Sequence, residues 1–129
     1  MTDVNVTNEP GPGTARVDEI VKAHPVTLFM KGTQLFPQCG FSSRAVAILD
    51  RLGADYHTVD VLQDPEIRQG VKAYSDWPTI PQLYVKGEFV GGCDIVTEMT
   101  LSGELDQLLD RHGIQYDREA AERIREANA

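Results

Sequence analysis

Two short strand-like segments on either side of one helical segment constrain the fold of this chain most. Val26–Met30 is almost wholly apolar, as expected of a buried strand, and Tyr56–Asp60 alternates apolar and polar residues. Between them, from Gly40 to a stop at Gly53, apolar residues recur every three or four positions, which is helical spacing. Such a unit places its strands in parallel with a right-handed crossover.

A hairpin follows later in the chain. Gln82–Val85 and Glu88–Val90 read as strands, and Lys86-Gly87 between them is a two-residue turn signal. The hairpin adds two antiparallel strands to the parallel pair. The sequence therefore predicts an α/β fold with a four-stranded mixed sheet.

Further helices are expected to cover both faces of this sheet. One is predicted over Ala15–Ala23 with Thr14 as its cap, and another from Pro65 to about Tyr74. A last helix should begin at a capping Asp94 and continue its apolar stripe to Leu109.

The length of 129 residues suits one domain. Residues 1–13 hold Pro and Gly and no apolar period, so we predict a disordered lead-in. The domain itself is expected over residues 14–112. Residues 113–129 are charged with few large apolar side chains, and we expect a solvated helix or a frayed tail.

Charge and composition exclude several classes of partner. The net charge of −8 argues against nucleic acid and anionic membranes. No apolar run approaches the roughly 18–20 residues that span a bilayer. The first residues have neither secretory nor transit-peptide character, so the expected location is the cytoplasm.

Cys39 is the residue that points to chemistry. It stands directly before the predicted helix and beyond the carboxyl end of the first strand. In open sheets of this kind, ligands bind at that edge. Free N–H groups and the helix dipole lower the pKa of a thiol there, and the thiolate is both nucleophile and metal ligand. The alternative is a small buried apolar residue.

Ser42 stands where a C-x-x-C motif has its second cysteine. A serine hydroxyl cannot resolve a mixed disulfide, so an internal redox couple between residues 39 and 42 is ruled out. The two cysteines of the chain, Cys39 and Cys93, are also too few for a disulfide scaffold or a thiolate zinc site.

Four motifs in order resemble monothiol glutaredoxins. Cys39-Gly-Phe-Ser42 resembles their active-site signature, and the resemblance extends from about Thr14 to about Arg111. The other motifs are Leu28-Phe-Met-Lys-Gly-Thr33 with Phe36-Pro-Gln-Cys39, Trp77-Pro-Thr-Ile-Pro-Gln82, and Gly91-Gly-Cys-Asp94. The resemblance implies a thioredoxin-like fold and a glutathione site.

The resemblance also assigns residues to that site. Lys31 and Arg68 match positions that hold the glycine carboxylate of glutathione, although Arg68 by itself reads as an exposed cation. Ile80 precedes the family's cis-proline and would pair its backbone with the tripeptide; an ordinary trans proline is the alternative. Cys93 and Asp94 match the clamp on the γ-glutamyl end, and Asp94 would cap its helix as well.

The roles of Trp77, Cys93 and the three histidines are less defined. Trp77 matches a family residue near the site, and core packing is its alternative. Cys93 could be a packing or ligand-contact residue, a resolving thiol or a regulatory thiol. The histidines His24, His57 and His112 show no metal-ligand spacing and are expected on the surface.

The resemblance implies that a 2Fe–2S cluster bridges two copies of the chain. Such a cluster usually needs four thiolates, which two Cys39 side chains and two glutathiones would supply. The implied function is cluster storage and transfer, with BolA-type proteins and apo iron–sulfur proteins as partners.

An oxidoreductase is the competing hypothesis. Cys39 could take glutathione from a glutathionylated protein. The longer loop Gly32–Gln38 is associated in the family with weak activity of this kind, so enzymatic function is left open and the carrier is favoured. An interaction module that senses iron or redox state is a third hypothesis.

Overall fold

A four-stranded mixed sheet forms the centre of the computed structural model, which describes residues 11–127. The strand order is β2-β1-β3-β4; β1 and β2 are parallel, and the other two pairs are antiparallel. The elements are α1 (Pro12–Ala23), β1 (Val26–Met30), α2 (Gly40–Leu52), β2 (His57–Asp60), the short 3-10 helix η2 (Val61–Gln63), α3 (Pro65–Ser75), β3 (Gln82–Val85), β4 (Glu88–Gly91), α4 (Cys93–Ser102), α5 (Glu104–Arg111) and α6 (Arg118–Ala127). The predicted α/β fold is confirmed.

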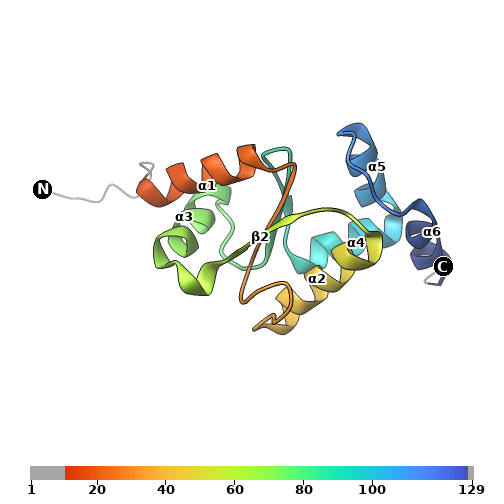
Figure 1. The fold of residues 1–129 in the computed structure, drawn as a ribbon, viewed down its shortest axis with the longest axis horizontal. Coiled ribbons are helices and arrows are strands. Elements are labelled where there is room, and N and C mark those ends of the chain that lie inside the picture. The colour runs from red at the N-terminus through yellow and green to blue at the C-terminus, as the bar shows by residue number, and fades with distance from the viewer. Residues whose placement is uncertain (1–10, 128–129) are drawn as a thin grey trace, which may run out of the picture.

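Helices cover both faces of the sheet, as Figure 1 shows. Helices α1 and α3 lie against one face, and α2 and α4 lie against the other. Successive residues of a strand point to opposite faces, so Leu28 and Phe29 of β1 enter different cores. The fully buried pattern of β1 in the middle of the sheet follows from this double cover.

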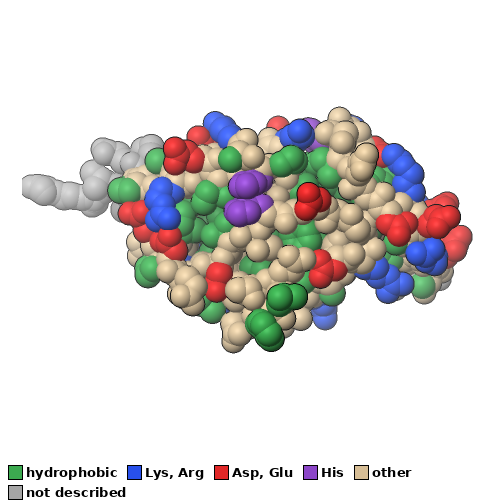
Figure 2. All heavy atoms as spheres, in the orientation of Figure 1, with side chains coloured by type: hydrophobic (Ala, Val, Ile, Leu, Met, Phe, Trp, Pro, Cys, Tyr) green, Lys and Arg blue, Asp and Glu red, His purple; other side chains and the backbone are tan. Residues whose placement is uncertain are grey.

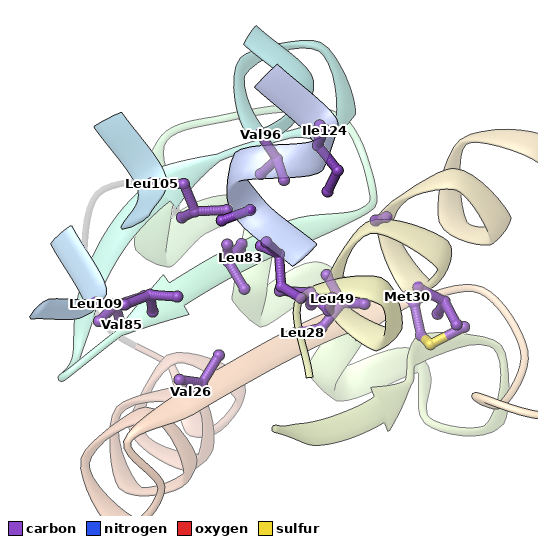
Figure 3. Packing of buried hydrophobic residues seen from close by; sticks show 14 residues of the cluster. Val26, Leu28, Met30, Leu49, Leu83, Val85, Val96, Leu105, Leu109 and Ile124 are labelled. Carbon is purple, nitrogen blue, oxygen red and sulfur yellow. The ribbon is translucent and has the colours of Figure 1, made fainter. Parts of the chain in front are cut away.

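The larger core lies between the sheet and α2, α4, α5 and α6. Figure 3 shows Leu28 and Leu83 of the sheet packed against Leu49 of α2 and Val96 of α4. Ile124 of α6 packs into the same cluster. The larger core therefore joins the predicted domain to the C-terminal helix.

The smaller core joins α1 and α3 to the opposite face. Phe29 and Tyr84 of the sheet are almost fully buried there. The two helices approach so closely at Gly13 and Gly70 that a Cβ on Gly70 would lie 2.4 Å from a backbone carbon of Gly13. A side chain at either glycine would push the helices apart.

Helix α1 begins earlier than predicted. Its cap is Gly11, and Pro12 occupies the first turn, where a proline is tolerated because its missing N–H would have no partner. Thr14 lies inside the helix, and its hydroxyl donates to the Gly11 carbonyl. Residues 12 and 13 are therefore helical, and the prediction that they belong to a disordered lead-in is wrong. Residues 1–10 of the predicted lead-in lie outside the described residues.

The C-terminal region differs most from expectation. The single helix predicted from Asp94 to Leu109 is two helices, because Gly103 adopts a left-handed conformation (φ +86°) between α4 and α5. The cap of α4 is Gly92, and Asp94 lies within the first turn, so the predicted capping role of Asp94 is wrong.

The segment from residue 113 onward, predicted as a solvated helix or a frayed tail, contains a helix, α6, but this helix is packed against the core rather than solvated. Helix α6 buries Ala120, Ala121 and Ile124, which lie on one side of the helix. Arg125 of α6 forms an ion pair with the largely buried Asp106 of α5. The buried side of α6 consists largely of alanines, which are too small to stand out as an apolar pattern in the sequence. Their small side chains nevertheless allow α6 to pack closely against the core.

The remaining boundaries agree with the prediction to within a residue, and α2 spans the predicted segment. Within residues 11–127, no helix is long and apolar enough to cross a membrane.

Candidate functional site

Cys39 occupies the N-cap position of α2. Its backbone is extended (φ −152°, ψ 139°), and the helix begins at Gly40. The side chain is half-buried, so the sulfur is held by the protein and still reachable. A capping side chain faces the free N–H groups of the first helical turn. The sulfur therefore has the position in which a helix stabilises an anion.

The surroundings of Cys39 lower the pKa of its thiol. The backbone N–H of Ser42 has the largest effect, and the N–H of Phe41, the charge of Lys31 and the Ser42 hydroxyl act in the same direction. Burial opposes them by raising the pKa, but the net direction is downward. The predicted activated thiolate is thus supported by the geometry.

Ser42 links the thiol to the neighbouring strand. It is fully buried, and its hydroxyl oxygen accepts a hydrogen bond from the backbone N–H of Lys31 at 3.1 Å. That hydroxyl can donate its own proton to the Cys39 thiolate. Ser42 therefore holds α2 against the end of β1 while stabilising the negative sulfur.

The loop from Gly32 to Gln38 is held by its own hydrogen bonds and by Asp60. The Gly32 N–H donates to the Asp60 carboxylate at 2.9 Å, and the Gln38 N–H donates to the Lys31 carbonyl at 2.8 Å. Leu35 and Phe36 at the loop tip are 83% and 71% exposed. The loop that leads to Cys39 thus exposes two large apolar side chains.

Cys39 opens into a cavity of about 490 Å³. The cavity lies between the start of α2, α3, the Trp77–Pro81 segment and the start of α4. Its lining residues are Lys31, Cys39, Phe41, Lys72, Trp77, Pro78, Thr79, Ile80, Pro81, Gly92, Cys93, Asp94 and Ile95. A cavity of this size can hold a small peptide-like ligand.

Most of the predicted site residues meet in this cavity. Lys31, Ile80, Cys93 and Asp94 line it together with Cys39. The Ile80–Pro81 bond is cis, as the resemblance implied. Trp77 is 41% exposed and lines the cavity, so it is a site residue rather than a core residue.

Arg68 does not line the cavity, and Lys72 does. Lys72 follows Arg68 by one turn of α3 and shares its side of the helix, so the two cations are neighbours. Sequence reasoning missed Lys72; its helical spacing from Arg68 was the available signal. Within residues 11–127, neither of them nor Lys31 forms an ion pair. A chain of net charge −8 therefore keeps three cations unpaired at or beside one cavity.

Cys93 and Asp94 bring the start of α4 to the cavity wall. Cys93 is buried and is a free thiol, which favours the packing or ligand-contact role over a freely reactive one. Asp94 is exposed in the first turn of α4, where helix N–H groups also point outward. One carboxylate and several N–H donors thus face the same end of the cavity.

The three histidines lie away from the thiol, around a second cavity of about 480 Å³. The rings of His24 and His57 are stacked with their centroids 3.8 Å apart, and histidine side chains form a compact group in Figure 2. Among residues 11–127, no cluster of three or more His, Cys, Asp or Glu side chains could hold a metal ion.

Comparison with known proteins agrees with this site. The family model for glutaredoxin matches residues 26–90, from the first strand to the last. The chain belongs to the glutaredoxin family. A relative from Synechocystis, described as an uncharacterized monothiol glutaredoxin ycf64-like, is 59% identical over 96 residues, which are 74% of this chain and 90% of that protein. The resemblance to monothiol glutaredoxins is therefore confirmed.

Longer glutaredoxins and solved structures are also similar. Mitochondrial monothiol glutaredoxin-5 of Saccharomyces cerevisiae is 50% identical over 97 residues, which are 73% of this chain but only 65% of the yeast protein. A truncated mutant of Trypanosoma brucei 1-C-Grx1 superposes with a TM-score of 0.74 at 45% identity, covering 80% of this chain and 94% of that one. A buckwheat glutaredoxin–glutathione complex superposes with a TM-score of 0.70 at 28% identity, covering 78% of this chain and 90% of the buckwheat chain. The glutaredoxin fold is thus shown.

Proposed function

We propose that this glutaredoxin binds glutathione in the Cys39 cavity and, as a dimer, carries a 2Fe–2S cluster for storage and transfer to apo-proteins. The observation that carries the proposal is a single reachable, ionisable thiol at a cavity with unpaired cations, with a serine in place of a second thiol three positions on. The buckwheat relative's complex with glutathione supports the choice of ligand.

The cavity offers a partner for each part of glutathione. Lys31 and Lys72, with Arg68 beside them, would hold the glycine carboxylate by charge-assisted hydrogen bonds. No described residue bonds to the backbone N–H or C=O of Ile80, which leaves both groups for the peptide part of the ligand. The helix start at Cys93 and the carboxylate of Asp94 suit the carboxylate and amino group of the γ-glutamyl end.

The donor chemistry of the site fits a cluster shared between two copies. A 2Fe–2S cluster usually takes four thiolates, and this cavity presents one reachable cysteine per chain, whose thiol pKa is lowered by its surroundings. Two copies with two glutathiones complete the set. The exposed Leu35, Phe36 and Phe41 around the thiol would provide apolar contact area between the copies. We propose BolA-type proteins and apo iron–sulfur proteins as further partners and the cytoplasm as the location.

Thiol–disulfide exchange is a second candidate, favoured by the lowered pKa of Cys39. The Cys39 thiolate would attack the glutathione sulfur of a protein–glutathione disulfide, releasing the protein thiolate. A second glutathione would then attack the Cys39–glutathione disulfide and leave as glutathione disulfide. Because residue 42 is serine, it supplies no thiol that could replace the second glutathione.

Anaerobic reconstitution separates the two functions. The protein is incubated with iron, sulfide and glutathione, and visible absorbance and molecular mass are recorded. We expect a coloured species of twice 14.3 kDa that is lost in Cys39→Ser and retained in the matched thiol variant Cys93→Ser. A colourless monomer with rapid glutathione-disulfide turnover would overturn the carrier proposal and support the enzyme.

A further inference from the structure

Gln82 is a buried polar residue directly behind the cavity wall. It is the first residue of β3, and its side chain is fully buried. A buried amide has two donor hydrogens and one acceptor oxygen that all need partners. Each of these partners can be identified, and two of them belong to the segment that lines the thiol cavity.

The amide nitrogen of Gln82 holds the cavity segment at two points. It donates to the Trp77 carbonyl at 3.0 Å and to the Thr79 carbonyl at 3.2 Å. Trp77, Thr79 and Ile80 all line the cavity that opens at Cys39. The two carbonyls are turned inward, toward the sheet, and the segment between them is tied to β3 by one side chain.

The amide oxygen of Gln82 is anchored in the core. It accepts a hydrogen bond from the Tyr84 hydroxyl at 3.1 Å, and Tyr84 is almost fully buried between the sheet and α3. Burial raises the pKa of Tyr84 to about 12, so the hydroxyl keeps its proton and stays a donor. The amide is therefore oriented with its nitrogen toward the cavity segment.

We propose that Gln82 is a positioning residue for glutathione binding. By holding the carbonyls of Trp77 and Thr79, it fixes the backbone of the Trp77–Pro81 segment so that the N–H and C=O groups of Ile80 remain available to an extended peptide ligand. The inference rests on the proposed glutathione site, and it adds a residue that does not itself line the cavity.

Replacement of Gln82 by methionine keeps the length of the side chain and removes both donors. The probe is S-methylglutathione, which can form neither a mixed disulfide nor a cluster, and its affinity is measured by calorimetry. We expect Gln82→Met to weaken binding roughly tenfold, because two hydrogen bonds that preorganise the segment are lost. Trp77 is the only tryptophan in the chain, so its fluorescence spectrum should shift in the same variant.

Two matched variants separate positioning from general stability. Leu83→Val weakens the larger core from the next residue of β3, and it should leave both affinity and the Trp77 spectrum unchanged. Gln82→Glu provides a pH profile: a carboxylate facing two carbonyls repels them, whereas its protonated form can donate to one. Its affinity, expressed relative to that of the unmodified protein at each pH so that any effect of Cys39 titration cancels, should therefore rise as pH falls from 8 to 6.

The outcomes distinguish this inference from the proposed function. If the unmodified protein does not bind S-methylglutathione, the proposed site itself is wrong. If it binds, and folded Gln82→Met binds within twofold of it, the positioning role is wrong. If Gln82→Met does not fold, the test depends on Gln82→Glu, measured over the pH range in which it is folded. An affinity of Gln82→Glu for S-methylglutathione that, relative to the unmodified protein, does not change with pH would then overturn the inference.

Discussion

Ser42 places a hydroxyl where a second thiol would create an internal redox pair. Its oxygen accepts from Lys31 and its proton can stabilise the Cys39 thiolate, so Ser42→Ala should raise the pKa of the Cys39 thiol. A hydrogen bond to a charged group contributes about 1.5–3 kcal/mol, which sets an upper limit of about one to two pKa units.

The rate of Cys39 alkylation across pH measures this change. The inflection of the rate should move upward in Ser42→Ala and stay in place in Ser43→Ala, which alters the adjacent, exposed serine. An unchanged inflection in both variants would mean that the backbone N–H groups of the helix start suffice to ionise the thiol.

Lys72 is the cation of α3 that lines the cavity. We expect Lys72→Gln to weaken S-methylglutathione binding roughly tenfold, because one charge-assisted hydrogen bond to a carboxylate is lost. Arg68→Gln should have a smaller effect, and Lys86→Gln, beside the second cavity, should have none. Calorimetric titration would show the order; a larger loss for Arg68 would contradict the assignment.

Cys39 and Lys72 show how much of a site a local sequence pattern can predict. Cys39 could be found from sequence because its activation depends on the adjacent helix start, which is a local property. For Lys72, helical spacing from Arg68 indicates only that the two cations are neighbours. Which of them lines the cavity could not be predicted, because the placement of α3 is decided by its packing against α1 and the sheet. The family resemblance pointed to Arg68, and only the tertiary arrangement distinguishes the two cations.

Among the elements, α6 contributes to the larger core although its sequence suggested a solvated segment. Ile124→Ala should lower the free energy of unfolding by about 2 kcal/mol, since a large buried side chain is truncated. Urea denaturation followed by far-ultraviolet circular dichroism measures this loss. Glu122→Ala, on the exposed side of the same helix, should change stability by less than about 0.5 kcal/mol. Equal effects of the two variants would mean that α6 does not pack as described.

At the scale of the whole molecule, the stacked pair His24–His57 links folding to pH. Burial, and then the nearby charge of His24, lower the pKa of His57. The other ionisable side chains that line this cavity are Asp55, Tyr56, Lys86 and His112. Because the folded protein binds fewer protons here than the unfolded chain, its stability should fall as pH falls below about 6.5.

The contribution of His57 to the pH dependence of stability can be separated from that of the acidic residues. Asp18, Asp64 and Asp110 also have lowered pKa values, each first through a side-chain hydrogen bond, but their stabilisation is lost only below about pH 4. Urea unfolding between pH 5 and 7 should therefore show a shallower pH dependence in His57→Gln than in the unmodified protein or in Asp55→Asn. Parallel curves for all three proteins would contradict the prediction.

The sequence by itself determined the strand–helix–strand unit, the hairpin and the helix start at Cys39. Each depends on neighbouring residues: apolar period, turn residues and the free N–H groups of a first helical turn. The tertiary structure alone decided that Lys72 lines the cavity, that Gln82 lies behind it and that α6 enters the core. Those outcomes depend on which distant surfaces meet, and a one-dimensional pattern does not contain that information.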